Sequence, residues 1–331
     1  RDLIIVIEAH QSKSYHLGFG KNVTRSNLSK ANENRNFKIF EDFANHLILI
    51  AQEKNSNDSF EIKGTVYAFD SSTIDLCLSV FWWAHFRKTK AGIKLHTLFD
   101  INTQIPVFIH ITEANVHDVN AMDVIKYEPF AYYIFDRAYV DYLRLYRITK
   151  SDAYFVVRAK SNVKFKRMYS KKTDKSTGVI YDQTGKIDGF YTSKDYPEKI
   201  RKVKFFDAEN KKMLIFLTNN FDLSAQQIAL LYKQRWQIEL FFKWIKQHLK
   251  VKTFWGTTEN AVRIQINIAI ITYCLVSIIA KDLKINRSIY EILQILSVSL
   301  LDKTPVNELL MKSDYNNVNE LDSNQLVFNL F

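Results

Sequence analysis

The sequence has few cysteines and no uninterrupted hydrophobic run of the length of a membrane span. Its two cysteines, Cys77 and Cys274, lie far apart in apolar surroundings, so we expect buried thiols in a reducing, cytoplasmic compartment rather than disulfides or a zinc site. The most apolar run, Ile266–Ala280, is interrupted by polar residues and is shorter than the roughly 20 residues of a membrane span. We therefore predict a buried core helix there and no membrane partner.

Acidic residues are fewer than basic ones. The chain has 35 Asp and Glu against 46 Lys and Arg, which gives a net charge of +11 and a pI near 9.3. A basic chain favours polyanionic partners, either nucleic acid or an anionic membrane surface. No signal peptide, internal repeat or low-complexity tract is visible, and the first residue is not Met, so we expect that a start has been removed. With 331 residues, 47% of them hydrophobic, the chain can build one large domain or two to three smaller ones around a real core.

One stretch, Tyr232–Lys246, contains neither Gly nor Pro and is dense in apolar residues. Ser224 precedes it as a candidate N-cap, so we predict one long helix from about Ala225 to about Leu249. At about 100° per residue, its polar residues share one narrow stripe, which consists of Tyr232, Arg235, Glu239 and Lys246. A carboxylate flanked by cations suits a metal-bound phosphodiester. The alternative is an ion pair between Arg235 and Glu239 on a solvated face.

Two predicted strands, 65–70 and 131–136, each end in an aspartate, Asp70 and Asp136. If these strands lie side by side, a helix packed across their ends can bring Glu239 to the same place. Three carboxylates can hold two divalent cations for in-line phosphoryl transfer, and Mg²⁺ or Mn²⁺ suits such an all-oxygen site. Taken singly, a strand-end aspartate often caps a turn. Other acids compete for the same role, namely Asp75, Asp100, Asp118 and Asp141.

Five regions are expected along the chain. Residues 1–62 form a helical N-terminal DNA-binding region, in which a helix-turn-helix is as reasonable as a small helical pack with a solvated face. In the former, the residues facing DNA would be Arg25, Ser26, Lys30 and Arg35. Residues 63–157 and 223–300 form the two parts of a core, separated by an insertion at 158–222 and followed by a tail at 301–331.

The first part of the core predicts a mixed sheet with helices packed on it. Its strands are expected at 65–70, 93–99, 105–112, 131–136 and 154–157, and its helices at 118–126 and 141–150. The insertion carries short alternating runs at 179–181, 190–192, 202–206 and 213–218, so we predict a β-rich segment with a basic edge. A solvated loop is the alternative for its basic stretch. Interleaved aromatics favour a nucleic-acid surface, and they are Phe165, Tyr169, Phe190 and Tyr191.

The stripe residues match the pattern Tyr-x2-Arg-x3-Glu-x6-Lys, and the chain resembles the DDE transposases of the bacterial insertion-sequence-four-like family. Phe69–Thr73 resembles the block around that family's first acid. Ile134–Tyr139 resembles the block around the second, although Gly more often stands at the place of Ala138. Gly92–His96 and Thr112–Asp118 also look like family blocks, and the likeness runs from about residue 26 to about residue 310.

The resemblance implies an α/β protein with an RNase H-like mixed five-stranded sheet flanked by helices and a β-rich insertion between the second and third acids. It implies cut-and-paste transposition, with two Mg²⁺ or Mn²⁺ ions held by Asp70, Asp136 and Glu239. Phosphates near the cleaved end would be contacted by Tyr232, Arg235 and Lys246, and further DNA contacts are expected from Lys164, Lys166 and Arg167. The partners would be transposon terminal inverted repeats and target DNA, bound by a homodimer in the bacterial nucleoid.

Some members of that family stack a flipped base on a Trp of the insertion, yet all five Trp of this chain lie outside 158–222. Either Phe165 or Tyr191 substitutes for it, or the DNA-hairpin step that some members use between nicking and strand transfer is absent. His96 and His117 are expected to be core or turn residues rather than ligands. Two other functions stay open: a resolvase-like nuclease of the RNase H-like class, and a catalytically silent DNA-binding protein derived from a transposase.

Overall fold

The structure is a computed structural model that describes residues 2–14, 18, 23–56, 62, 64–87, 90–248, 254–299 and 304–310. Its α-helices are α1 (Asp2–Ala9), α2 (Gln11–Ser14), α3 (Arg25–Asn34), α4 (Phe37–Asn55), α5 (Tyr142–Lys150), α6 (Thr192–Asp195), α7 (Ala225–Gln234), α8 (Trp236–His248), α9 (Glu259–Asp282), α10 (Ile289–Ser299) and α11 (Val306–Leu310). Short 3-10 helices are η1 (Asp118–Val124), η2 (Arg137–Tyr139) and η3 (Lys175–Thr177).

The strands are β1 (Val66–Leu76), β2 (His85–Arg87), β3 (Lys90–Asp100), β4 (Ile105–Glu113), β5 (Tyr132–Phe135), β6 (Tyr154–Arg158), β7 (Phe165–Lys171), β8 (Val179–Ile187), β9 (Ile200–Asp207) and β10 (Lys212–Thr218). Five of them form the central sheet in the order β4-β3-β1-β5-β6. β1, β3 and β4 are antiparallel neighbours, whereas β5 lies parallel to β1 and to β6. This order is the RNase H-like mixed sheet that the sequence analysis predicted.

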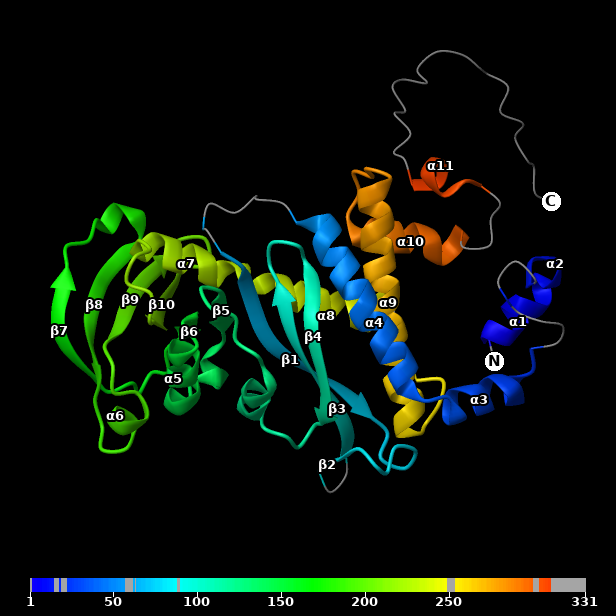
Figure 1. Ribbon diagram of the computed structural model, residues 1–331, viewed down its shortest axis with the longest axis horizontal. Coiled ribbons are helices and arrows are strands. Elements are labelled where there is room, and N and C mark those ends of the chain that lie inside the picture. The colour runs from blue at the N-terminus through cyan, green and yellow to red at the C-terminus, as the bar shows by residue number, and fades with distance from the viewer. Residues whose placement is uncertain are drawn as a thin grey trace, which may run out of the picture.

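The insertion continues this sheet instead of forming a separate body. β10 pairs antiparallel with β6, and β9, β8 and β7 follow outward, so the described residues form one ten-stranded sheet with β7 at its edge. In Figure 1 these strands lie at one end of the molecule and helices α1–α3 at the other. The insertion is β-rich, as predicted, but the strand expected at 190–192 was wrong. Residues 191–195 instead form a turn and the short helix α6, after Gly189 at φ 140°.

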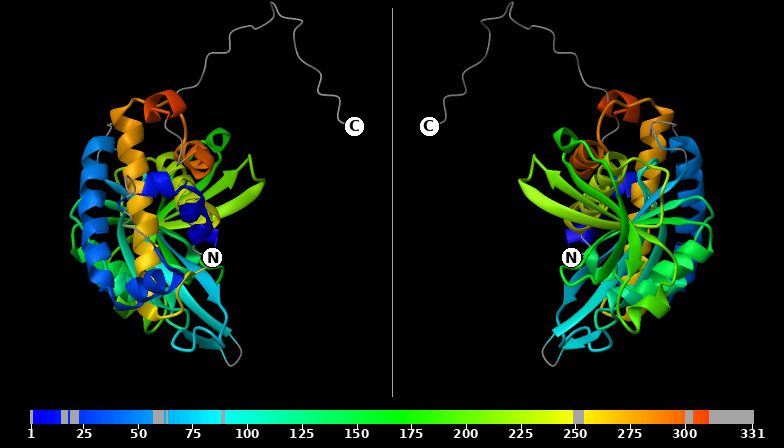
Figure 2. Two further views of the ribbon diagram at one scale, coloured as in Figure 1. Left: turned by 90° about the vertical axis from the view of Figure 1, so that its right-hand side faces the viewer. Right: turned by 90° about the vertical axis from the view of Figure 1, so that its left-hand side faces the viewer.

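Helices cover both faces of the central sheet. α4 and α9 lie side by side on one face, as both views of Figure 2 show, and α7 and α8 complete that layer. The other face packs against η1 and α5. Strand β1 supplies both cores by alternation, since Val66 and Ala68 belong to the first core and Tyr67 and Phe69 to the second.

The long helix predicted over 225–249 is divided. α7 ends at Gln234, Arg235 adopts φ −52° and ψ −29°, and α8 begins at Trp236. The backbone tightens there, because the amide of Arg235 donates to the carbonyl of Tyr232 and the amide of Ile238 donates to that of Arg235. No Gly or Pro marks this division. Ser224 does cap α7, and its capping box with Gln227 confirms the predicted start.

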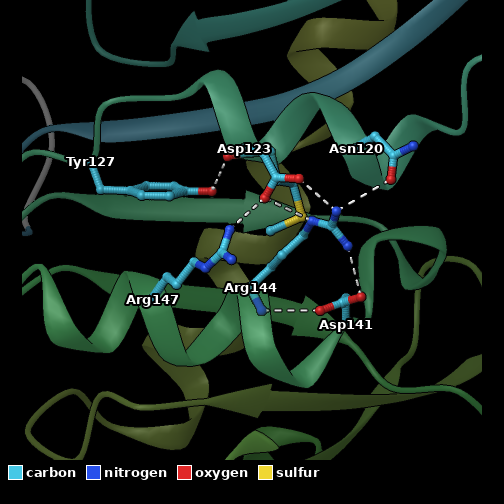
Figure 3. A network of polar contacts seen from close by, with 7 residues as sticks. Asn120, Asp123, Tyr127, Asp141, Arg144 and Arg147 are labelled. Carbon is cyan, nitrogen blue, oxygen red and sulfur yellow. Dashed lines mark hydrogen bonds and ion pairs between the residues drawn. The ribbon is translucent and has the colours of Figure 1, made fainter.

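A polar network fastens the segment before β5 to the helix after it. Arg144 of α5 donates to both carboxylate oxygens of Asp123 in η1, at 3.0 and 2.6 Å, and also to Asp141 and Asn120 (Figure 3). Arg147 adds a second cation to Asp123 at 2.7 Å. Exposed pairs contribute little singly, but a bidentate pair within a network restrains geometry. The network therefore fixes η1 relative to the start of α5.

Two expectations about apolar residues had different outcomes. Cys274 is buried as predicted, whereas Cys77 is exposed in the turn after β1, so the prediction of a buried thiol was wrong there. One helix within the described ranges, α9, is long and apolar enough to cross a membrane, but 67% of its most apolar window is buried inside the fold. It packs against α4 and contributes to the main core, which confirms the predicted core helix.

The N-terminal helices are present, and α4 is part of the core layer. The side chain of Asn260, at the start of α9, donates to the carbonyls of Asn32, Glu33 and Arg35 and accepts from the amide of Phe37. This single amide side chain fixes the α3–α4 junction against α9.

The residues expected to face DNA in a helix-turn-helix are all exposed, namely Arg25, Ser26, Lys30 and Arg35. Most of the predicted tail at 301–331, and Leu249, lie outside the described residues.

Candidate active site

Asp70 and Asp136 lie at neighbouring positions where β1 and β5 stop pairing. The parallel register joins Val66 to Tyr132 and Phe69 to Phe135, so each aspartate directly follows the last pair. β1 itself continues to Leu76 alongside β3, which corrects the prediction that this strand ends at the acid. Alternation places Asp70 on the same face as Val66 and Ala68, which is the face that α7 and α8 cover.

Arg235 joins two of the predicted acids directly. Its Nη1 donates to Asp70 Oδ2 at 2.9 Å, and its Nη2 donates to Glu239 Oε1. The side chain of Arg235 is only 14% exposed, against 20% for Asp70 and 34% for Glu239. The intrahelical pair foreseen as an alternative does form, but it faces the sheet rather than solvent. One guanidinium thus spans carboxylates that are contributed by β1 and α8.

The third acid is connected to the same cluster by Tyr232, whose hydroxyl donates to Asp136 Oδ1 at 3.4 Å. The Tyr232 ring lies near the guanidinium carbon of Arg235, at 5.9 Å, and burial raises the pKa of its phenol to about 12, so it is a neutral donor. The last residue of the predicted stripe, Lys246, donates to the backbone carbonyl of Thr73 in β1 at 2.7 Å. All four stripe residues therefore face the part of the sheet where β1 and β5 stop pairing.

The electrostatics of Asp70 show that the acids crowd together. Burial raises the pKa of its carboxyl to about 6, against the opposing effects of the Ser71 amide and the Arg235 cation. The charges of Asp136 and Glu239 raise it further. Conversely, burial acts to lower the pKa of Arg235, but Tyr232, Glu239 and Asp70 hold it above its ordinary value. The cluster is thus an anionic site that this cation partly neutralises.

A polar layer behind Asp70 was not assigned a role by the sequence analysis. The Ser71 amide donates to Asp70 Oδ1 at 2.8 Å, and the Ser71 hydroxyl donates to Asp118 Oδ1 at 2.6 Å. Lys94 pairs with that same Asp118 oxygen at 3.0 Å, and the Tyr139 hydroxyl reaches Asp70 Oδ1 at 3.5 Å. Asp118 had been noted only as a competing acid. The signal that could have found this layer is that Lys94, Asp118 and Tyr139 all stand in the blocks that carry the family resemblance.

The donor chemistry of the site fits a divalent cation. Across the part of the chain that is described, no three His, Cys, Asp or Glu side chains are arranged to hold a metal ion in the present geometry. In this geometry one oxygen each of Asp70 and Glu239 accepts from Arg235. A buried carboxylate with a raised pKa beside two further acids nevertheless needs a compensating cation, and an all-oxygen set suits Mg²⁺ or Mn²⁺.

The predicted DNA-contacting residues of the insertion lie at its outer edge. Lys164, Lys166 and Arg167 are exposed on and just before β7, the edge strand. Of the two aromatics that could stack a base, Phe165 is partly buried beneath the ammonium of Lys202 at 5.1 Å, whereas Tyr191 is 75% exposed. Tyr191 borders a hollow of about 630 Å³ between the start of α5 and α6.

His96 is buried in β3 against Thr112, and His117 is an exposed turn residue, so both have the structural settings expected for them.

Comparison with known proteins places this geometry in context. The profile of the transposase DDE domain matches residues 61–275. A putative transposase y4zB of Sinorhizobium fredii is 35% identical over 77% of this chain and 71% of that protein. A probable transposase for insertion sequence element IS5377 of Geobacillus stearothermophilus is 31% identical over 69% of this chain and 60% of that protein. A solved piggyBac transposase synaptic complex with hairpin DNA is 14% identical over 77% of this chain and 59% of that one, with a TM-score of 0.41, which is too weak a likeness to add to the fold.

Proposed function

Because the chain belongs to the transposase DDE domain family and is a DNA transposase, we propose that it moves an insertion sequence by cut-and-paste transposition. The ends of the element would be cut by hydrolysis, and their 3′-hydroxyl groups would then be joined to target DNA. The observation that carries this proposal is the convergence of acids from β1 and α8 on one guanidinium, with Asp136 beside them.

Dependence on a divalent metal is general in this family. Here Asp70, Asp136 and Glu239 would hold two Mg²⁺ or Mn²⁺ ions. When bound, such ions activate the attacking water or hydroxyl and stabilise the leaving oxygen. The chain's own residues position the ligands: the Ser71 amide and Tyr139 orient Asp70, and Tyr232 orients Asp136.

DNA is the substrate of this family, and the finer contacts are part of the proposal. Tyr232, Arg235 and Lys246 would bind phosphates near the cleaved end, since a neutral donor and two cations beside a carboxylate cluster match a metal-bound phosphodiester. Lys164, Lys166 and Arg167 would follow the duplex farther along, from the edge strand. The exposed ring of Tyr191 would take the place of the missing Trp in stacking a displaced base.

Assembly and regional roles belong to the same proposal. A homodimer would hold the two inverted repeats together and bring them to target DNA in the nucleoid. Arg25 and Lys30, both exposed on α3, would add contacts to DNA outside the catalytic site. The core parts 63–157 and 223–300 would carry out catalysis, and the insertion 158–222 would bind DNA.

Incubation with candidate element ends and Mg²⁺, followed by mapping of nicked and joined products, tests the reaction. We expect nicks at the ends and joined strand-transfer products. Nicking without joining would favour the resolvase-like nuclease instead. Binding of the ends without metal-dependent cleavage would establish a silent DNA-binding protein.

A further inference from the structure

Arg235 lies between two of the carboxylates that would hold the proposed metal ions. Its two terminal nitrogens donate to oxygens of Asp70 and Glu239, and both of those carboxylates would be metal ligands in the function proposed above. Arg235 takes one oxygen of each carboxylate, so a divalent ion that bound these oxygens would compete with the guanidinium for them. Two cations in one small site also repel each other, most strongly where water is scarce.

The setting of Arg235 further indicates a residue with two arrangements. Its side chain is 14% exposed, yet within the described residues its buried Nε has no hydrogen-bond partner. A buried donor without an acceptor is costly, so this arrangement does not satisfy the guanidinium fully. Arg235 also lies between α7 and α8, where the backbone tightens to i→i+3 hydrogen bonding.

We propose that Arg235 is a placeholder cation that couples DNA binding to metal binding. In the free protein it neutralises Asp70 and Glu239 and competes with a divalent ion for their oxygens, so it moves away from them when metal is bound. A DNA phosphate offers the guanidinium two acceptor oxygens outside the acid cluster. Binding to it therefore stabilises the conformation in which Arg235 has moved away from Asp70 and Glu239. DNA therefore raises metal affinity, and by thermodynamic linkage metal raises DNA affinity by the same factor. The free transposase would thus resist metal loading until DNA is bound.

Calorimetric titration of Mn²⁺ into the DNA-free protein tests this inference. Arg235→Gln should bind Mn²⁺ more tightly than the wild type, by a factor within the roughly 5- to 150-fold range of typical coupling. Lys150→Gln is the matched control, because it removes one positive charge from an exposed pair with Glu198 outside the acid cluster and should bind Mn²⁺ like the wild type. Unchanged or weaker Mn²⁺ binding by Arg235→Gln would overturn the proposal.

Asp70→Asn separates this inference from the function on which it rests. If Asp70→Asn abolishes Mn²⁺ binding while Arg235→Gln leaves it unchanged, the metal site stands and only the placeholder role fails. If Asp70→Asn binds Mn²⁺ like the wild type, the proposed metal site itself fails. A crystal structure of the wild-type protein soaked in Mn²⁺ tests the same point without any substitution. Where metal is bound, Arg235 should lie away from both carboxylates. A metal-bound site with Arg235 still bridging them would contradict the proposal.

Discussion

At the scale of single residues, Arg235 has a sequence spacing typical of a surface ion pair, but in the fold it is a buried bridge between two acids. The spacing of Arg235 and Glu239 is that of an ordinary helix ion pair. Burial against β1 adds Asp70 as a second acceptor and turns the pair into part of an anionic cluster. The cost of burying these charges is met only because they compensate one another.

Glu239→Gln should abolish cleavage and retain DNA binding, because it removes a metal ligand and leaves the phosphate-binding cations in place. Gel-based cleavage and fluorescence-anisotropy binding assays on the same duplex measure the two effects. Glu209→Gln is a suitable control, since that exposed carboxylate pairs with Lys233 at 3.3 Å, away from the acids. Retained cleavage by Glu239→Gln would remove this residue from the catalytic site.

His96 should make the folded protein less stable in acid. Burial lowers the pKa of its imidazole to about 4, with smaller lowering contributions from His110 and Lys94 and an opposing one from Asp118. The unfolded chain then binds the proton more readily, so stability is full above about pH 6.5 and is lost as the pH falls toward 4. The loss from this group amounts to about 3 kcal/mol.

The measurement is urea unfolding of the wild type and of His96→Gln between pH 7 and pH 4. The variant lacks the titrating ring, so its stability should fall less steeply over this interval, whereas the exposed control His117→Gln should behave like the wild type. Equal slopes for His96→Gln and the wild type would show that another group controls acid stability.

At the scale of elements, the insertion contains a buried ion pair whose arginine also reaches the loop before α7. Arg201 of β9 donates to both oxygens of Asp182 in β8, each at 2.8 Å, and its Nη1 donates to the carbonyls of Asn220 and Leu223 just before α7. The two side chains are 1% and 6% exposed. The pair therefore joins the insertion strands to the loop that leads into the α7–α8 layer.

Arg201→Ala should lower the free energy of unfolding by about 3–5 kcal/mol, because it leaves Asp182 buried without its partner. Chemical denaturation measures this loss. The double variant Arg201→Met with Asp182→Leu should lose much less, since neither charge then remains unpaired. Lys150→Ala removes an exposed pair with Glu198 and should leave stability nearly unchanged. A small effect of Arg201→Ala would mean that water replaces the lost contacts.

At the scale of the whole molecule, the ten-stranded sheet would connect the proposed catalytic site to the proposed DNA-binding edge. The acid cluster lies where β1 and β5 stop pairing, and β6 and β10 carry the same sheet outward to the basic edge strand β7. Because β10 pairs directly with β6, removing the insertion would also expose an edge of the core sheet. Point substitutions at the edge are therefore the cleaner test of its function.

The triple variant Lys164→Ala, Lys166→Ala, Arg167→Ala should weaken binding to end DNA and reduce its salt dependence by about one unit of slope per lost phosphate contact. Its matched control changes the net charge equally with Lys171→Ala, Lys172→Ala and Lys175→Ala, at the far end of the same hairpin. Binding measured from low to high salt separates a local contact from an effect of net charge. Identical slopes for the two triple variants would contradict a specific role for residues 164–167.

The amino-acid sequence by itself determined that the sheet is mixed and that four polar residues share one stripe of the helical segment after Ser224. The local signals were the alternation in β1 and β5 and the spacing of Tyr232, Arg235, Glu239 and Lys246. Within a strand or helix, the direction of each side chain follows from the period of that element, so such signals can be read without the tertiary structure. The tertiary structure decided what no short pattern carries: the division of the helix at Arg235, the exposure of Cys77, the fusion of the insertion with the core sheet, and the bridging of Asp70 and Glu239. Each of these depends on contacts between segments far apart along the chain, because burial and charge compensation are set by whichever neighbours the fold brings together.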